Sequence, residues 1–101
     1  MEQNELKNLI RGHLTPDEKL ISYPTKRKKK NLVLLWLSGR FEKGIVYTEK
    51  QVNELINQAC CFSDPALLRR ELYNYRFLDR KNDGSAYWLM DPQPTLEQLG
   101  L

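Results

Sequence analysis

Two groups of basic side chains are the residues of this sequence best suited to bind a ligand. The first is an uninterrupted run of cations: Lys26, Arg27, Lys28, Lys29 and Lys30. The second is spaced along one face of an expected helix: Arg69, Arg70, Tyr73 and Arg76. Lysine carries a compact charge that binds phosphate oxygens, whereas the guanidinium of arginine can donate two parallel hydrogen bonds to a phosphate or to the edge of a guanine base. Both groups therefore predict contact with nucleic acid.

The lysine-rich run conflicts with its local environment. We expect it to open a helix capped by Thr25, and cations in a first turn oppose the helix dipole at about 0.3–1 kcal/mol each. They also repel one another at spacings of three and four residues. A phosphate backbone would supply the missing counter-charge, so the run indicates phosphate contacts. The alternative is a solvated basic face on the outer side of a core helix.

The second group lies on a helix with a well-marked start. Asp64 is a good N-cap, and Pro65 suits the first helical position. The leucines of the segment fall on one side of the helix and the arginines on the other, so the arginines and Tyr73 are expected to face solvent. The alternative is a salt-bridged surface in which Glu71 and Asp79 neutralise them.

A β-hairpin is expected directly after this helix. Asp83 and Gly84 separate two strand-like runs, and an Asp-Gly pair favours a type I′ turn, which needs positive φ at both central positions. Arg80 and Lys81 lie at the mouth of this hairpin. They are expected to contact the backbone or an adjacent groove of a nucleic acid.

The remaining segments supply the elements that position these residues. Residues 2–13 predict a short amphipathic helix, and the apolar residues 32–37 predict the middle of a core helix that ends near residue 40. Residues 48–51 match a capping box that opens a helix ending near residues 60–62. Residues 45–47 predict a very short strand that pairs with the hairpin.

Aromatic and leucine residues are the expected anchors of the core. Trp36 and Trp88 are interpreted as core residues, and Tyr87 or Trp88 should be buried against the helix of residues 32–37. Near the C-terminus, Leu96 and Leu99 should dock a terminal turn onto the domain. The order helix, helix, strand, helix, helix, hairpin predicts an α+β fold.

Within that class, the sequence predicts a winged helix-turn-helix, mainly helical with a small antiparallel β-hairpin wing, plus an extra N-terminal helix. Residues 1–24 would form the N-terminal helix and linker, residues 25–90 the winged-helix domain, and residues 91–101 a C-terminal tail. The 101 residues, 41% of them hydrophobic, suit one domain with a modest core.

Composition and motifs narrow the class of protein. No apolar run approaches the roughly 20 residues that span a bilayer, and the N-terminus lacks the basic region of a signal peptide, so we expect a cytoplasmic protein. Cys60 and Cys61 are expected to be reduced. His13 is the only histidine, so neither a metal nor another cofactor is expected. No phosphate-binding loop, nucleophile elbow or clustered carboxylate pair indicates an enzyme.

Much of the chain resembles a known bacterial family. The shared features run from about Leu20 to Trp88: Pro24 with the run 26–30, Arg40-Phe41-Glu42, Tyr47, Glu49, Val52, Asn53, Leu68–Leu72, Leu78–Arg80, Asp83–Ser85 and Tyr87-Trp88. This pattern is similar to domain of unknown function 2087, found alone or at the C-terminus of helix-turn-helix transcription regulators. The resemblance implies a winged-helix-like fold in a regulatory setting, with no particular activity.

One departure from that family affects the second basic group. Its members usually have Gly where this chain has Arg76, and Gly would end the helix in the left-handed conformation. Arg76 must therefore either adopt that conformation or let the helix continue for another turn. The Cys60-Cys61 pair and residues 91–101 also lie outside the shared pattern.

These observations predict a DNA-binding protein that acts in transcription regulation, with double-stranded DNA as its partner. The step from fold to function is an analogy. The alternative is a protein-interaction or dimerisation module with a winged-helix fold and no DNA binding, which would bind an acidic protein or a second copy of itself. A third interpretation is RNA binding, with Tyr73 or Tyr75 stacking on bases.

Overall fold

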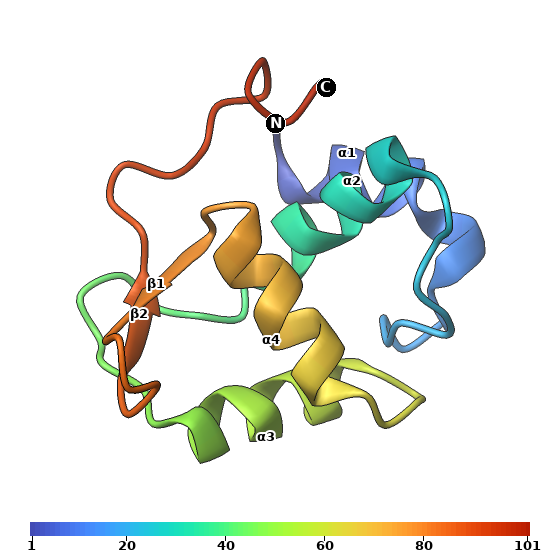
Figure 1. The fold of residues 1–101 in the computed structure, drawn as a ribbon. Coiled ribbons are helices and arrows are strands. Elements are labelled where there is room, and N and C mark those ends of the chain that lie inside the picture. Colours follow the sequence, from blue (N-terminus) through green and yellow to red (C-terminus); the bar gives the residue numbers. More distant parts are fainter.

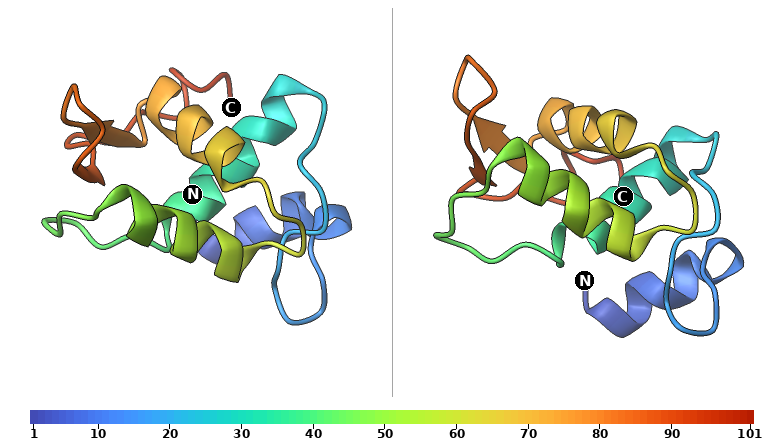
Figure 2. Two further views of the ribbon diagram at one scale, coloured as in Figure 1. Left: turned by 60° about the horizontal axis from the view of Figure 1, so that its bottom comes forward. Right: turned by 90° about the horizontal axis from the view of Figure 1, so that it is seen from below.

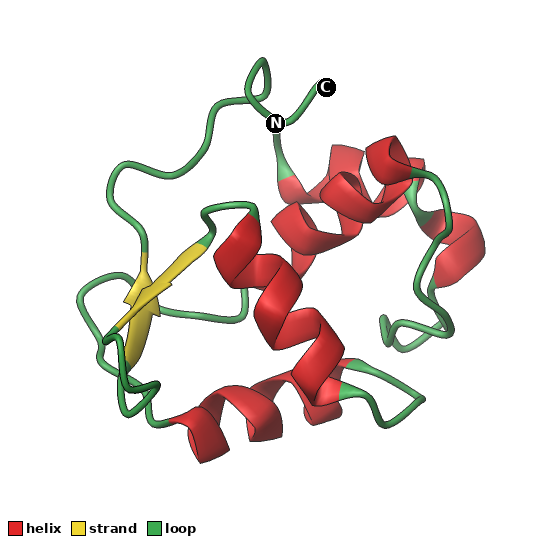
Figure 3. Ribbon diagram, viewed as in Figure 1, coloured by secondary structure: helices red, strands yellow, loops and turns green.

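The computed structural model describes residues 1–101 and has an α+β fold of four helices and one two-stranded antiparallel sheet (Figures 1 and 3). A short 3-10 turn follows the first helix. The elements in chain order are α1 (Gln3–Leu9), the 3-10 turn (Arg11–His13), α2 (Arg27–Ser38), α3 (Glu49–Ala59), α4 (Pro65–Asn74), β1 (Leu78–Arg80) and β2 (Tyr87–Leu89). The α+β class predicted from the sequence is confirmed.

Helix α2 passes through the core, because apolar residues surround its axis on every side. All its residues from Asn31 onward are buried except Leu35, which is half-buried. The N-cap is Lys26, whose carbonyl accepts the first helical bond from the Lys30 N–H at 2.9 Å. The expected Thr25 cap is therefore wrong by one residue, and no side chain caps this helix. The helix also ends earlier than expected, at Ser38.

Helices α3 and α4 begin as their sequences predict. The Thr48 hydroxyl accepts the Gln51 N–H, and the Gln51 side chain accepts the Thr48 N–H, which completes the capping box. The Asp64 carboxylate accepts the Leu67 N–H at 3.3 Å, with Pro65 at the first position of α4. The two helices lie side by side and pack against each other (Figure 2).

A left-handed residue ends α4. Arg76 has φ of +66°, its N–H donates to the Tyr73 carbonyl at 3.1 Å, and the Phe77 N–H donates to the Leu72 carbonyl at 2.9 Å. This pair of bonds is the Schellman motif, and the buried side chains of Phe77 and Leu72 provide its hydrophobic contact. Of the two alternatives for Arg76, the protein adopts the left-handed one.

The hairpin after α4 is confirmed, but its turn differs from the prediction. The paired residues of β1 and β2 are Leu78 with Leu89, Asp79 with Trp88, and Arg80 with Tyr87. Beyond them the Lys81 N–H donates to the Ala86 carbonyl at 2.9 Å, so the connecting loop is longer than a two-residue turn. Only Gly84 has a positive φ, of 74°, because the Asp83 carboxylate accepts the Ser85 N–H and folds the loop differently. The type I′ prediction is therefore wrong.

A third chain segment joins the sheet at one residue. The Tyr47 N–H donates to the Tyr87 carbonyl at 2.7 Å, and the Tyr87 N–H donates to the Tyr47 carbonyl at 2.8 Å. This antiparallel bridge confirms that the segment before α3 pairs with the hairpin, although it is too short to count as a strand. The Tyr47 ring also packs edge-on against Phe41, with centroids 5.3 Å apart.

Side chains of β2 alternate between the core and the outside. Tyr87 is only 5% exposed, as expected for a residue packed into the core. Its neighbour Trp88 is half-buried, because adjacent strand residues point to opposite faces of a sheet. The interpretation of Trp88 as a core anchor is wrong, whereas Trp36 is buried as expected.

The C-terminal tail packs on the domain through two of its three leucines, the buried Leu99 and the half-buried Leu101. Leu99 is buried, and its carbonyl accepts a hydrogen bond from the buried Asn31 amide of α2 at 2.9 Å. Leu96 remains exposed, so its predicted docking is wrong. The Thr95 hydroxyl accepts the Gln98 N–H and closes a compact turn, in which Leu99 points inward and Leu96 outward.

Candidate nucleic-acid interface

A polar groove lies between α4 and the hairpin. It has a volume of about 370 Å³, and its walls combine side chains from three elements. The residues that line it are Arg69, Arg70, Tyr73 and Asn74 of α4, Arg80, Asp83, Gly84 and Tyr87 of the hairpin, and Glu49 of α3. The fold thus brings Arg69, Arg70 and Tyr73 of the second basic group together with Arg80 of the hairpin, whereas Arg76 and Lys81 do not line the groove.

Arg69 is held within the protein instead of facing solvent. Its guanidinium donates to the Asn53 side chain and lies 3.1 Å from a Glu49 carboxylate oxygen, both on α3. The side chain is 14% exposed, so the expectation that it is exposed is wrong. The cause is that α3 turns an acid and an amide toward α4 at this point. Arg69 therefore positions α4 on α3, and its charge is already neutralised.

Arg70 and Asn74 form an exposed ridge one helical turn long. The Arg70 Nε donates to the Ala66 carbonyl at 3.3 Å, while its two terminal amino groups make no hydrogen bond or ion pair within the chain. Asn74 lies four residues later on the same face, is exposed, and its amide also has no partner. The sequence did not identify Asn74 as a candidate binding residue, because a short polar residue near the end of a helix is typical of helix termination and does not by itself indicate ligand binding.

A cation–π contact connects the helix to the hairpin. The Arg80 guanidinium lies 4.7 Å from the centroid of the Tyr73 ring. Arg80 is half-buried, whereas Lys81 and Arg76 are exposed and make no ion pair. Two acids also border the groove, and hydrogen bonds from Ser85 hold the pKa of Asp83 below its usual range. Arg70 and Arg80 therefore line the groove without an ion pair, whereas Arg76 and Lys81 are exposed cations that do not line it.

Part of the lysine-rich run has internal partners. Arg27 lies 3.0 Å from a Glu71 carboxylate oxygen on α4, and its guanidinium is 4.1 Å from the centroid of the Tyr75 ring. The Tyr23 hydroxyl donates to the same Glu71 oxygen at 3.0 Å. Burial, followed by the hydrogen bond to Glu71, raises the pKa of Tyr23 above its usual range. Arg27 thus joins α2 to α4, and Glu71 supplies its counter-charge.

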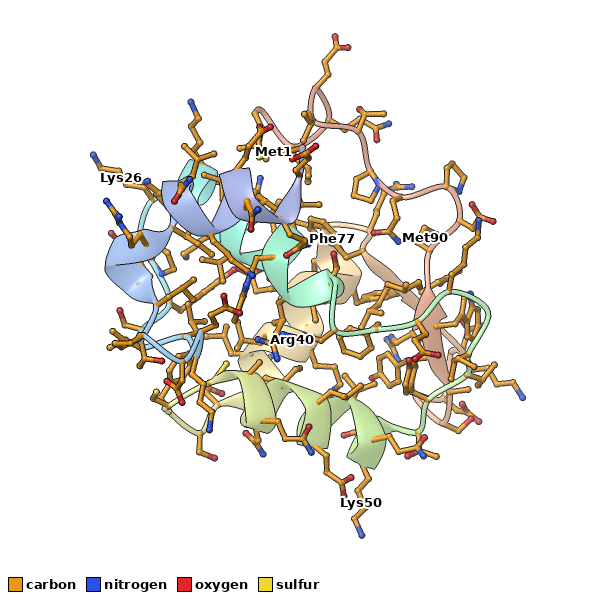
Figure 4. The ribbon with its side chains drawn as sticks, turned by 180° about the vertical axis from the view of Figure 1, so that it is seen from behind. Met1, Lys26, Arg40, Lys50, Phe77 and Met90 are labelled. Atoms are coloured by element: carbon orange, nitrogen blue, oxygen red, sulfur yellow. The ribbon has the colours of Figure 1, made fainter.

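The lysines of this run divide into held and free side chains. Lys29 donates to the Leu9 carbonyl at the end of α1, at 2.6 Å, and is half-buried instead of exposed as expected. Lys30 is half-buried and lies 5.4 Å from a tyrosine ring. Lys26 and Lys28 are exposed and make no hydrogen bond or ion pair through their side chains. Figure 4 shows Lys26 pointing away from the ribbon at the border of the molecule.

The two cysteines lie outside the groove between α4 and the hairpin. Both are free thiols; Cys61 is exposed, and burial, followed by the charge of Cys61, raises the pKa of the Cys60 thiol to about 11. No group of three or more His, Cys, Asp or Glu side chains is close enough to hold a metal ion. The chain also has no helix with the length and apolar character needed to cross a membrane.

Fold and site together define a small α+β protein with unpaired cations on one exposed helix and on the hairpin beside it. Residues 19–89 match the model of a family described as uncharacterized proteins conserved in bacteria, DUF2087, and the chain belongs to that family. The match extends from the segment before α2 to the end of β2 and excludes α1 and the tail. No curated protein and no solved structure matches the chain.

Proposed function

We propose that this chain is a DNA-binding winged helix-turn-helix protein that acts in transcription regulation. In this proposal α3 and α4 form the helix-turn-helix, α4 enters the major groove of DNA, and the β1–β2 hairpin is the wing. The supporting observation is the Arg70–Asn74 ridge, which faces solvent beside a hairpin that carries a further free cation. The major groove of B-DNA admits one α-helix, and in this proposal α4 lies there with Arg70 and Asn74 toward the bases.

The proposal assigns different roles to the basic residues. Arginine pairs with the O6 and N7 atoms of guanine, and asparagine pairs with the N6 and N7 atoms of adenine, so Arg70 and Asn74 would read bases. Arg76, Lys81 and the free lysines of the run would contact phosphates, which carry affinity and no sequence information. Tyr73 and Arg80 would support the wing against the helix.

The internally paired arginines have a structural role in this proposal. Arg69 fixes α4 on α3, and Arg27 fixes α4 on α2, so both orient the reading helix without touching DNA.

A second candidate function is a protein-interaction module without DNA binding. Asp83, which borders the groove and makes no ion pair, favours it, because its carboxylate would repel phosphates and attract a partner with basic side chains.

Fluorescence anisotropy with a randomised labelled duplex tests DNA binding directly. If about four phosphates are neutralised, log K should fall against log salt with a slope of about −3.6. Replacing Lys26 and Lys28 with Ala should lower affinity for all sequences and reduce the slope by up to about two units. Lys50→Ala is the matched control, because Lys50 lies on α3 and points away from the rest of the protein (Figure 4).

Selection of preferred sequences from the same pool tests base reading. Arg70→Ala and Asn74→Ala should each lose about 1–3 kcal/mol of discrimination at one base position while keeping their affinity for random duplex within a few-fold. No binding at about 50 mM salt would refute the proposal and favour the protein-interaction module. If the Arg70→Ala and Asn74→Ala variants bind but lose affinity equally for random and selected duplexes, the ridge contacts phosphates and does not read bases.

A further inference from the structure

A buried tyrosine points its hydroxyl into the groove between α4 and the hairpin. Tyr87 is only 5% exposed and lines the groove, yet its hydroxyl makes no hydrogen bond within the protein. Every fully buried polar side-chain atom of the protein has a partner, so this hydroxyl must reach the surface of the groove. A nearly buried tyrosine usually pairs its hydroxyl, so a partner from outside the protein is expected at this point.

Three polar atoms surround one point at the loop of the hairpin. Gly84 leaves this point open, because a Cβ atom there would lie 3.6 Å from Arg80 Nη1 and 3.9 Å from both the Tyr87 hydroxyl and Glu49 Oε2. The loop lies beside the first turn of α3, which brings Glu49 to it (Figure 1). Arg80 and Glu49 form no ion pair, and neither bonds to the Tyr87 hydroxyl. A polar group placed between them can therefore bond to all three.

These three atoms offer both donors and an acceptor. Arg80 Nη1 donates one hydrogen to the Asn82 carbonyl at 3.5 Å, which leaves its second hydrogen and the Nη2 amino group free. The Tyr87 hydroxyl can donate as well. Glu49 pairs with Arg69 through Oε1, so its Oε2 remains an acceptor. The site therefore fits a group that has several acceptor oxygens and also a proton to donate.

Charge and the need for a proton together select the ligand. Three arginines and two carboxylates line the groove, and the excess of one positive charge favours an anion. An anion without a proton would place its oxygen against Glu49 Oε2 and leave that acceptor unsatisfied. Inorganic phosphate carries a proton at neutral pH, whereas sulfate and the phosphodiesters of nucleic acids carry none. Phosphate monoesters lose theirs above a pKa of about 6.

We propose that this groove binds inorganic phosphate, as hydrogen phosphate, at the loop of the hairpin. Arg80 and the Tyr87 hydroxyl donate to its oxygens, and its own hydroxyl donates to Glu49 Oε2. Half of the Glu49 side chain is exposed, so water competes and the dissociation constant should be on the order of 1 mM. The site uses neither Arg70 nor Asn74, to which base reading is assigned, and the proposal stands whether or not the protein binds DNA.

Heteronuclear NMR measures the binding and its selectivity. Titration with sodium phosphate at about pH 7, at constant ionic strength, should shift the backbone amide signals of Gly84 and Ser85 along a saturable curve with a midpoint of about 1 mM. Sulfate and dimethyl phosphate should bind at least about tenfold more weakly, because neither can donate to Glu49. Glycerol phosphate, a monoester, should also bind more weakly than inorganic phosphate. The absence of a saturable shift, or equal or tighter binding of any of these three anions, overturns the proposal.

Removing the tyrosine hydroxyl tests its assigned role. Tyr87→Phe keeps the buried ring and should weaken phosphate binding about tenfold, because one hydrogen bond to a charged group is lost. Circular dichroism checks that the variant is folded. A folded Tyr87→Phe variant that binds phosphate as the wild type does overturns the proposal.

Replacing the carboxylate tests the selectivity. In Glu49→Gln the amide oxygen can keep the contact with Arg69 while the amino group donates to either anion, so sulfate should bind as tightly as phosphate. Glu54→Gln is the matched control, because it removes the same charge from an exposed position of α3 outside the groove and should keep the preference for phosphate. A Glu49→Gln variant that still prefers phosphate as the wild type does contradicts the assigned role of Glu49 and overturns the proposal.

Discussion

Replacing Arg76 with Gly should stabilise the protein. Arg76 is exposed and holds φ of +66° at the end of α4, where a side chain with a Cβ atom costs about 1–2 kcal/mol relative to the right-handed conformation. Gly avoids this cost but gains freedom in the unfolded chain, which offsets about 0.4–1 kcal/mol. The Schellman bonds to the Tyr73 and Leu72 carbonyls do not involve the side chain and should persist. The net gain is about 0.5–1 kcal/mol, or about 2–8 °C in Tm for a domain of this size.

Urea and thermal unfolding followed by circular dichroism measure this gain, with Arg76→Ala as the control. Ala removes the same guanidinium but keeps the Cβ atom, so it should not gain stability. Equal stability of the Gly and Ala variants would refute the argument from backbone conformation. Because both variants lose one cation, they should weaken DNA binding to the same extent if Arg76 contacts phosphate. Stability and binding are therefore separable at this one position.

Further predictions concern the tail, the paired arginine and the thiols. Leu99→Ala should lower the free energy of unfolding by about 2–4 kcal/mol in urea titrations, whereas the exposed Leu96→Ala should change it by less than about 0.5 kcal/mol. Arg69→Met should cost about 1–2 kcal/mol, because it leaves the half-buried Asn53 side chain without its hydrogen-bond partner, while Arg70→Met on the free ridge should be nearly neutral; equal costs would contradict the assigned roles. A thiol reagent at about pH 8 should modify the exposed Cys61 quickly and Cys60 only as the protein opens. Because the pKa of Cys60 is raised from 9.0 to about 11 in the folded state, its contribution to stability should be complete below pH 9.0 and be lost as pH rises toward 11, and Cys60→Ala should remove this dependence.

The features that could be predicted from the sequence are those determined by a few neighbouring residues. The capping box of Thr48 and Gln51 and the Asp64 cap with Pro65 depend on groups within three positions of one another, and the hairpin after α4 is indicated by the adjacent Asp83 and Gly84 of its loop. Local preference and final structure agree at these points. Even the ambiguity at Arg76 was a local one, and the protein resolved it toward the left-handed conformation because Phe77 is buried against Leu72.

The availability of each basic residue could not be predicted, because its partner lies far away along the chain. Lys29 is 20 residues from the carbonyl it binds, and Arg27 is 44 residues from Glu71. Both contacts require α1, α2 and α4 to be packed already. The unfavourable interaction of the lysine-rich run with the positive end of the α2 dipole is thus partly offset within the protein, by the Glu71 carboxylate and the Leu9 carbonyl. Lys29 and Lys30 contact a carbonyl and a tyrosine ring, and only the side chains of Lys26 and Lys28 have no partner at all, so these two are the part of the run most available to phosphates.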